Sequence, residues 1–231
     1  MGDIQVVSFD ADDTLWHNEP YFLEAQEQFW HLMEDFLPAH ASGAELNKTE
    51  GQNIQLYGYG IKAFILSMIE SAIRISDGRI TSRGIETIIN YGKEMMDKPV
   101  ELLDGVQEVL EQLNGQYRLV VATKGDLLDQ ERKLVKSGLA DYFHHIEIVS
   151  DKTEPEYQKL IRHLDIAPEN FLMIGNSLRS DVLPVLNVGG HAVHVPYHTT
   201  WEHEQIDFEI EHDQFHEISS LADLPGLLQG V

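Results

Sequence analysis

The stretch that most constrains the fold is residues 4–16, with the sequence IQVVSFDADDTLW. Its first half is a short apolar run with β-branched residues, which is typical of a buried strand. The run ends in three aspartates, Asp10, Asp12 and Asp13, followed by Thr14. Burying such carboxylates costs free energy unless a metal cation or hydrogen-bond donors pair with them. The stretch therefore predicts a metal and phosphate site or, as the alternative, an acidic turn after a surface strand.

The charge balance restricts the partners of the chain. Its 231 residues include 16 Lys and Arg against 39 Asp and Glu, which gives a formal net charge of −23. Nucleic acid and anionic membranes need a basic face, so we expect neither as the main partner. An anionic substrate must be attracted by a local feature, such as a bound cation or a lysine.

The chain shows no sign of export. It has no cysteine, which excludes a disulfide framework and thiol chemistry. The start, MGDIQVV, lacks the basic and apolar regions of a signal peptide. No apolar run reaches the roughly 18 residues that a membrane-spanning helix needs. We therefore expect a cytoplasmic protein.

After Trp16 the apolar residues repeat at helical spacing. One helix is predicted from Phe22 to Phe36 and ends before Pro38, and two more are predicted over 61–73 and 82–96. A polar stretch with two glycines, residues 41–51, follows the first helix. The aromatic and methionine stripes indicate packing between helices rather than a cofactor site. Residues 17–97 are therefore predicted to form an all-helical insertion.

From residue 100 onward, predicted strands alternate with predicted helices. The strands are expected at 119–122, 146–149, 171–174 and 192–195, with a short strand or turn and a helix over 218–228. Asp104 and Asp151 are expected to cap helices, and Gly138 to end one. Such alternation is typical of βαβ units. We predict a doubly wound α/β core with a parallel sheet, formed by residues 1–16 and 98–231.

Polar residues follow four of the predicted strands. The carboxyl ends of parallel strands meet at one edge of a sheet, so these side chains are expected to share one pocket. They are Asp10, Asp12 and Thr14; Thr123 and Lys124; Lys152; and Asn176 and Asp181.

This set resembles the haloacid dehalogenase-like hydrolase superfamily, whose core has a Rossmann-like fold. The first family motif, Asp-x-Asp-x-Thr after a strand, corresponds to residues 10–14. The second, a strand that ends in Thr or Ser, corresponds to residues 120–123, and the third is Lys152. The fourth, an acidic motif after a strand, is the segment 175–181, GNSLRSD. A helical cap between the first and second motifs is also typical of the family.

The resemblance implies a phosphatase mechanism. Asp10 would attack phosphorus and form an aspartyl-phosphate, and Asp12 would protonate the leaving group and then activate water. The Thr123 hydroxyl, the Lys124 backbone N–H and the Lys152 ammonium would bind the phosphoryl oxygens. The substrate would be a small phosphorylated metabolite.

The resemblance also implies a Mg²⁺ ion, which would offset the repulsion between a carboxylate and a phosphate. Its ligands would be Asp10, the backbone carbonyl of Asp12 and the fourth motif. That motif usually begins Gly-Asp, whereas this chain has Asn176, so one negative charge is missing. Either Asn176 or Asp181 would then be the direct ligand.

Three alternatives remain open from the sequence. Relatives that displace halide lack the second acid, so Asp12 argues against a dehalogenase. A phosphomutase would return a phosphoryl isomer instead of free phosphate. A binding or regulatory protein without turnover is favoured by Asn176.

Other polar residues are further candidates for functional sites. The glycine-containing turn 57–60 followed by Lys62 could face the substrate, or could be an ordinary helix start. The histidines 191, 194, 198 and 203 fit no common zinc spacing. The acidic tail, residues 202–217, is expected to be a solvated face.

Overall fold

The computed structural model describes residues 3–199 and 201–229, and it divides into two compact units. One comprises Met1–Glu19 with Val100–Val231, and the other Pro20–Pro99. The boundaries expected from the sequence, after residues 16 and 97, differ from these by two or three residues. No helix in the described ranges combines the length and apolar character that crossing a membrane requires.

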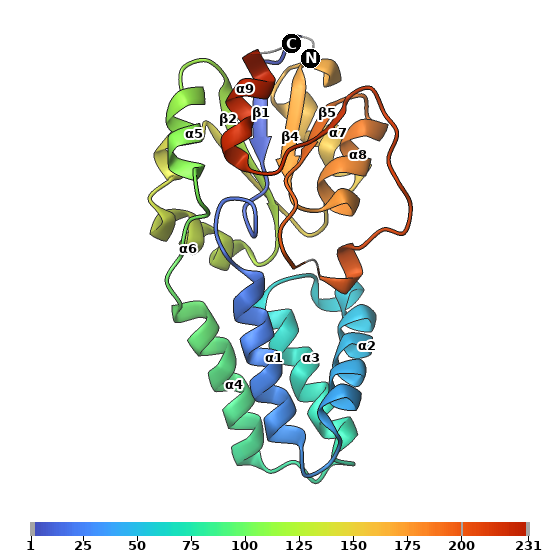
Figure 1. The fold of residues 1–231 in the computed structure, drawn as a ribbon. Helices are drawn as coiled ribbons and strands as arrows, with labels where there is room; N and C mark the ends of the chain where they lie inside the picture. Colours follow the sequence, from blue (N-terminus) through green and yellow to red (C-terminus); the bar gives the residue numbers. More distant parts are fainter. Residues whose placement is uncertain (1–2, 200, 230–231) are drawn as a thin grey trace. The chain divides into compact units, whose positions relative to one another are not determined.

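The first unit is built on six parallel strands in the order β3-β2-β1-β4-β5-β6 (Figure 1). The strands are β1 (Val6–Phe9), β2 (Arg118–Lys124), β3 (His145–Val149), β4 (Phe171–Gly175), β5 (His191–His194) and β6 (Phe215–Glu217). The first strand of the chain therefore lies inside the sheet, between β2 and β4. This confirms the predicted doubly wound α/β fold.

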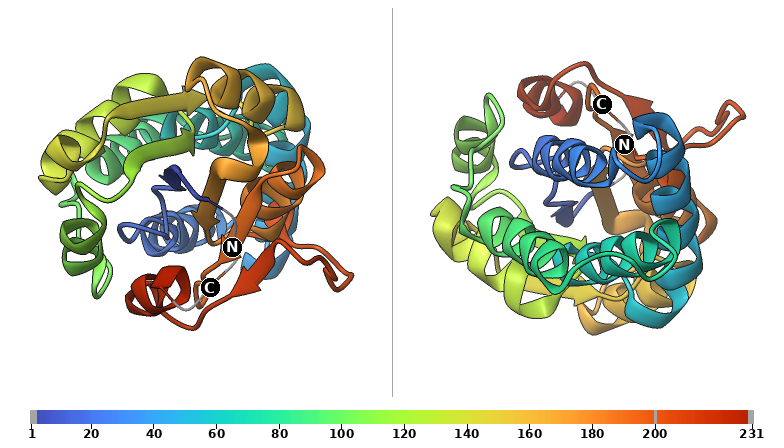
Figure 2. Two further views of the ribbon diagram at one scale, coloured as in Figure 1. Left: turned by 90° about the horizontal axis from the view of Figure 1, so that it is seen from above. Right: turned by 90° about the horizontal axis from the view of Figure 1, so that it is seen from below.

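Helices cover both faces of this sheet because successive strand residues point to opposite sides. Val7 and Phe9 pack with α5 (Val106–Leu113), α6 (Leu127–Ser137) and α9 (Leu224–Gln229). Val6 packs on the other face with α7 (Glu154–His163) and α8 (Leu183–Asn187). The view along the sheet in Figure 2 shows the two layers. All four residues of β1 are buried, which explains why three of them are apolar and why each face carries a valine.

The second unit is all-helical, with α1 (Glu19–Met33), α2 (Ala39–Tyr57), α3 (Ile61–Ile75) and α4 (Ser82–Asp97). Its apolar core includes Phe29, Met33, Leu46, Met68 and Ile88, all fully buried. The helices predicted over 61–73 and 82–96 are confirmed. Their apolar stripes pack against each other, as expected, although Ile89 is largely exposed.

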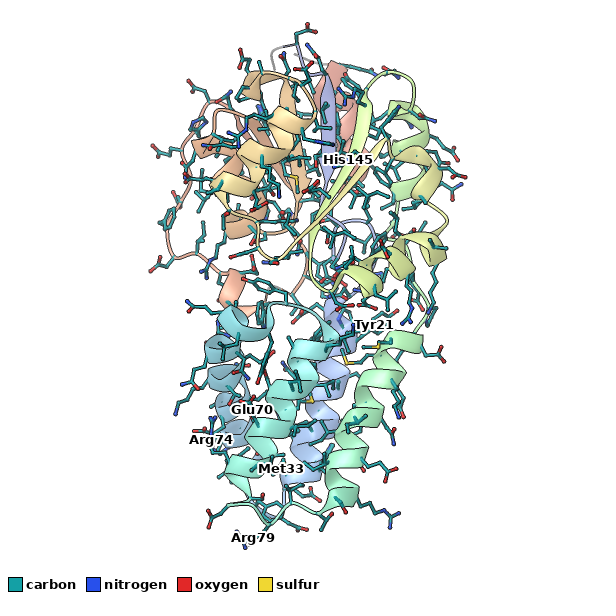
Figure 3. The ribbon with its side chains drawn as sticks, turned by 180° about the vertical axis from the view of Figure 1, so that it is seen from behind. Tyr21, Met33, Glu70, Arg74, Arg79 and His145 are labelled. Carbon is teal, nitrogen blue, oxygen red and sulfur yellow. The ribbon has the colours of Figure 1, made fainter. Side chains whose placement is uncertain are left out.

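The sequence did not predict α2. The polar stretch 41–51 forms its middle, because the side that faces α3 buries hydroxyl and amide groups instead of a full apolar stripe. Ser71 Oγ donates to Thr49 Oγ1 at 2.9 Å, and Asn53 Nδ2 donates to Ser67 Oγ at 3.1 Å. Figure 3 labels Glu70 and Arg74, further α3 residues that bond α2.

Two predicted helix caps were wrong, whereas Gly138 does end α6 in the left-handed conformation. Gly105, with φ of 80°, precedes α5, so Asp104 lies one residue too early to cap it. Thr153 precedes α7, and Asp151 accepts a hydrogen bond from the Lys152 N–H instead. Lys152 therefore lies before the helix and not in its first turn.

Candidate active site

The predicted site residues of the first unit gather at the carboxyl edge of the sheet, around the end of β1. Strand order reverses direction between β1 and β4, and such a switch point is where open α/β sheets bind ligands. Asp10 follows β1, and its N–H donates to Ile174 O of β4 at 2.8 Å. The backbone of Asp10 is thus fixed by the sheet, and Asn176 follows β4 beside it.

Lys152 joins the two buried carboxylates of the site. Its Nζ donates to Asp10 Oδ1 and, at 2.6 Å, to Asp181 Oδ1. The residues Asp10, Lys152 and Asp181 are 6%, 5% and 1% exposed. Burial raises the pKa of Asp10 to about 7, although the Lys152 charge opposes this. Burial alone would lower the pKa of Lys152, but the Asp10 and Asp181 charges outweigh it and raise that pKa.

Thr14 ties the loop after β1 to the loop after β4. Its Oγ1 lies 3.3 Å from both Asp10 Oδ2 and Asn176 Oδ1, and accepts a hydrogen bond from the Asn176 N–H at 3.1 Å. One hydroxyl proton cannot serve both acceptors, so Thr14 donates to one at a time. Asp10 and Asn176 are thereby held together.

Asp181 lies in a π-turn, Leu178–Val182, that follows β4. Its Oδ2 accepts a hydrogen bond from the Ser177 N–H at 3.0 Å. A Cβ atom on Gly175 would lie only 2.2 Å from that oxygen, so glycine is required there by space. Single π-turns are frequent at functional sites. Here the turn brings Asp181 back over the end of β4.

The oxygen ligands at this edge suit a hard cation. Asp10 and Asp181 supply carboxylates, and Asn176 supplies an amide oxygen. Within residues 3–199 and 201–229, no group of three or more His, Asp or Glu side chains is arranged to hold a metal ion. Mg²⁺ commonly uses one or two carboxylates and keeps several waters, so the side chains present fit Mg²⁺ without a third carboxylate.

Asp12 is held by donors that the sequence analysis did not single out. Its carboxylate accepts from Trp16 Nε1 at 2.7 Å, from Gln130 Nε2 at 2.9 Å, and from Lys133 Nζ at 2.9 and 3.0 Å. Lys133 Nζ also donates to Asn18 Oδ1 at 2.7 Å. Gln130 and Lys133 lie three apart on α6, on one face, just after the second motif. No local signal marks them in the sequence, because their contacts with Asp12 join residues 118 and 121 positions apart.

Thr123 and Lys124 end β2 beside the site. Phe9 pairs with Val121, so Thr123 extends beyond the end of β1 and is buried there. The Lys124 side chain points to the π-turn: its Nζ donates to Ser180 Oγ at 2.9 Å and forms an ion pair with Glu204.

Glu204 corrects the expectation of a solvated acidic tail. The residue is 9% exposed and lies in a short 3-10 turn, Glu202–Glu204, between β5 and β6. Its Oε2 accepts hydrogen bonds from the hydroxyls of Ser177 and Ser180. No sequence motif distinguishes Glu204, because the acidic residues near it in the chain are exposed.

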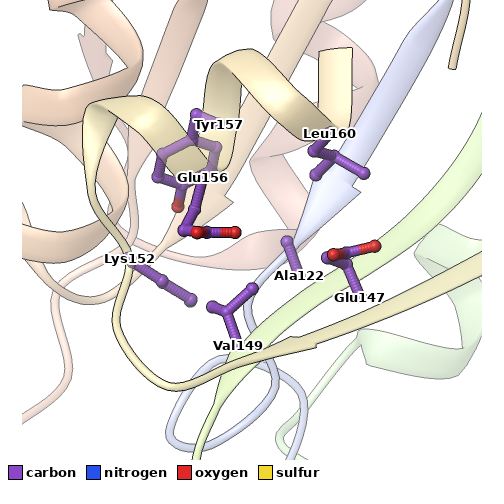
Figure 4. Close-up of a pocket in the computed structure, with 7 residues that line it drawn as sticks. All are labelled: Ala122, Glu147, Val149, Lys152, Glu156, Tyr157 and Leu160. Atoms are coloured by element: carbon purple, nitrogen blue, oxygen red, sulfur yellow. The ribbon is translucent and has the colours of Figure 1, made fainter. Parts of the chain in front are cut away.

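A pocket beside Lys152 lies between α7 and strands β2 and β3 (Figure 4). It is lined by Ala122, Glu147, Val149, Lys152, Glu156, Tyr157 and Leu160. Lys152 thus lines this pocket, while its ammonium binds Asp10 and Asp181.

Lys62 is exposed in the first turn of α3, in the helical unit. It follows a turn in which Gly58 and Gly60 have φ of 73° and 104°. Its role toward substrate stays a prediction. Among the weighed histidines, His194 bonds Glu217 through Nδ1 at 2.8 Å, and its Nε2 lies 3.1 Å from Asn176 O.

Comparison with known proteins identifies relatives over almost the whole chain. A family model described as haloacid dehalogenase-like hydrolase matches residues 4–189. A glyceraldehyde 3-phosphate phosphatase from Pyrococcus furiosus is 25% identical, covering 99% of this chain and 95% of its own. An N-acylneuraminate-9-phosphatase from Mus musculus is 28% identical over 56% of this chain and 53% of its own.

Solved structures share the fold. A haloacid dehalogenase-like family hydrolase from Xanthomonas campestris has a TM-score of 0.89 and 37% identity, covering 99% of this chain and 91% of its own. The L-2-haloacid dehalogenase from Xanthobacter autotrophicus has a TM-score of 0.69 at 14% identity, covering 99% of each chain. The same fold therefore occurs in dehalogenases, and it does not by itself select the reaction.

Proposed function

This chain belongs to the haloacid dehalogenase-like hydrolase family, and on that premise we propose that it is a Mg²⁺-dependent phosphatase of small phosphorylated metabolites. The observation that carries the proposal is the buried cluster in which Lys152 joins Asp10 and Asp181, with the acid Asp12 two residues beyond Asp10. The curated relatives named above are phosphatases, which supports phosphoryl transfer over dehalogenation.

In the first step, an Asp10 oxygen would form a bond to phosphorus while the bond from phosphorus to the leaving oxygen breaks. Asp12 would give its proton to that oxygen. In the second step, Asp12 would take a proton from water as the water oxygen bonds to phosphorus. The bond between Asp10 and phosphorus then breaks, which releases inorganic phosphate and restores the Asp10 carboxylate, while Asp12 again carries its proton.

The surrounding residues would position these groups. Gln130 and Lys133 hold the Asp12 carboxylate in one orientation by direct hydrogen bonds. The Lys152 ammonium, the Thr123 hydroxyl and the Lys124 N–H would bind the phosphoryl oxygens, where fixed positive groups stabilise developing charge.

Mg²⁺, when bound, would reduce the repulsion between the nucleophile and the anionic substrate. Asp10, the Asp12 carbonyl, and Asn176 or Asp181 would hold it. Because the net charge is −23, an anionic substrate needs a local positive feature, which the ion or a lysine would supply.

The helical unit, residues 20–99, would act as the cap that selects substrate, with Lys62 offering a cation to it. We expect Lys62→Met to raise KM for the preferred substrate several-fold with little change in kcat. An unchanged KM across the substrates tested would remove Lys62 from this role.

The test is release of inorganic phosphate from p-nitrophenyl phosphate, with Mg²⁺ and with EDTA. We expect turnover only with Mg²⁺, and a loss of about 10⁴-fold or more in Asp10→Asn. Asp104→Asn, the same change at an exposed position of the same unit, serves as the control. Metal-independent turnover, or turnover that survives Asp10→Asn, would overturn the proposal.

The other reactions have distinct readouts. Halide release from a 2-haloacid would indicate a dehalogenase, and a phosphoryl isomer as product a mutase. Phosphate-ester binding without phosphate release would indicate a binding protein. A panel of phosphorylated sugars, sugar acids and short aldehydes, the classes named for the relatives, would then identify the substrate class.

A further inference from the structure

Glu204 reaches the site from a part of the chain outside all four motifs. It lies in the connection between β5 and β6, beyond the residues 4–189 that the family model matches. Its side chain is nevertheless buried and contacts the turn that carries Asp181. A buried carboxylate is costly unless it is fully paired, so its partners indicate what it does.

The Glu204 carboxylate has three partners from two strand ends. Its Oε1 forms an ion pair with Nζ of Lys124, the last residue of β2. Its Oε2 accepts from Ser177 Oγ and, at 2.5 Å, from Ser180 Oγ, both after β4. Burial would raise the pKa of Glu204, but Lys124 and the two hydroxyls outweigh it and hold that pKa below its ordinary value. Glu204 thus remains a carboxylate at neutral pH.

Ser177 links Glu204 to the metal-binding end of the turn. Its Oγ accepts from the Ser180 N–H at 3.0 Å, and its own N–H donates to Asp181 Oδ2 at 3.0 Å. The same segment also holds the outer side of the turn, because Arg179 Nη1 donates to His203 O at 2.5 Å. The position of the Asp181 carboxylate therefore depends on a turn that Glu204 holds.

We propose that Glu204 is a positioning residue for the Mg²⁺ site: it fixes the π-turn so that Asp181 and Asn176 are preorganised to bind the ion. This rests on the proposed function, since it assumes Mg²⁺ at these residues. Groups that orient metal ligands through hydrogen bonds change metal affinity when they are removed. Glu204 also neutralises the charge of the Lys124 ammonium beside the proposed cation site.

Glutamine cannot replace this carboxylate. Glu204 Oε2 accepts from the Ser177 and Ser180 hydroxyls, and its Oε1 accepts from Lys124 Nζ, so all three partners are donors. An amide would place its NH₂ group against one of these donors, which removes a hydrogen bond from this buried cluster. The turn would then relax and Asp181 would lose its fixed position.

The experiment measures Mg²⁺ binding without substrate, by isothermal titration calorimetry on the full chain, for wild type and Glu204→Gln. We expect the Kd for Mg²⁺ to rise about 10- to 100-fold in the variant. The Mg²⁺-induced rise in Tm should shrink accordingly, since ligand stabilisation follows affinity. At saturating Mg²⁺, KM for p-nitrophenyl phosphate should change much less than the Kd for Mg²⁺.

The controls separate positioning from general damage. Glu209→Gln makes the same change at an exposed position of the same connection and should leave the Kd for Mg²⁺ unchanged. Where Glu204→Gln fails to fold, the double variant Glu204→Gln/Lys124→Met also removes the ammonium that Glu204 neutralises. It should fold and still bind Mg²⁺ more weakly than Lys124→Met alone.

The outcomes are distinguishable. If the wild type binds no Mg²⁺, the proposed function fails and this inference with it. If the wild type binds and hydrolyses, but Glu204→Gln or the double variant keeps the affinity of its reference protein, only the role of Glu204 is overturned. If the Kd for Mg²⁺ rose equally in Glu209→Gln, the cause would be the loss of one negative charge, and the positioning role of Glu204 would also be overturned.

Discussion

The carboxyl edge of the sheet and the α2–α3 interface both bury polar side chains, but of different kinds. At the sheet edge, the carboxyl groups of Asp10 and Asp181 share one lysine. Between α2 and α3, the hydrogen bonds in which both side chains are buried join neutral hydroxyls and amides, such as the pair Ser71 and Thr49. The degree of burial is similar, so burial alone does not separate the two regions.

The two regions differ in the free-energy cost of removing one partner from a buried pair. A neutral hydrogen bond contributes about 1 kcal/mol to stability, whereas breaking a buried ion pair costs about 3–5 kcal/mol. Replacing a buried ion pair by apolar residues is often neutral or stabilising, so ion pairs are a poor way to hold a fold. Buried charged pairs at the sheet edge therefore indicate a catalytic or binding role, whereas buried hydroxyls between α2 and α3 indicate packing of the two helices.

The largest effect is expected for Lys152→Met. Asp10 and Asp181 would be buried side by side without a cation, which should lower the free energy of unfolding by about 3–5 kcal/mol in EDTA. Mg²⁺ should restore part of it, because the ion takes over the neutralising role. Turnover should fall about 10²- to 10³-fold.

Urea unfolding with EDTA and with Mg²⁺ measures the Lys152 effect. Lys159→Met, on the exposed side of α7, is the control and should change neither the free energy of unfolding nor turnover. A loss below about 1 kcal/mol in Lys152→Met would mean that the sheet edge behaves like the α2–α3 interface.

An intermediate effect is expected for Gly175→Ala, because the new methyl group would overlap the Asp181 carboxylate. A displacement of this size should reduce turnover about 100-fold, with a stability loss of about 1–3 kcal/mol. Steady-state kinetics and urea unfolding measure the two quantities. Gly226→Ala, where no atom lies within 4 Å of the new group, is the control. Wild-type turnover in Gly175→Ala would contradict the geometry of the turn.

The smallest effect is expected for Ser71→Ala, which removes one neutral hydrogen bond to Thr49. The free energy of unfolding should fall by about 1 kcal/mol, equally with Mg²⁺ and with EDTA, and kcat should be unchanged. If the loss of unfolding free energy depended on Mg²⁺ or exceeded about 3 kcal/mol, the two regions would not differ in the way described.

The sequence predicted the parts of the structure that follow local rules. Strand patterns placed Asp10, Lys152, Asn176 and Asp181 at successive strand ends, and parallel topology then brought them to one edge. It could not predict Glu204 or Lys133, because each acts through a long-range contact and nothing local distinguishes it from a solvated charge. It missed α2 because hydroxyls and amides replace the apolar stripe that periodicity detects.

The place of β1 inside the sheet also has a consequence for how the protein matures. The strand β1, which precedes Asp10, is synthesised before its two neighbours, which begin at Arg118 and Phe171. Pairing between strands so far apart in the sequence is slow, because the entropy cost of closing a long loop precedes the favourable contacts. The acid cluster at the tip of β1 must therefore remain an open, water-exposed segment through most of synthesis, and catalytic competence comes among the last events of folding.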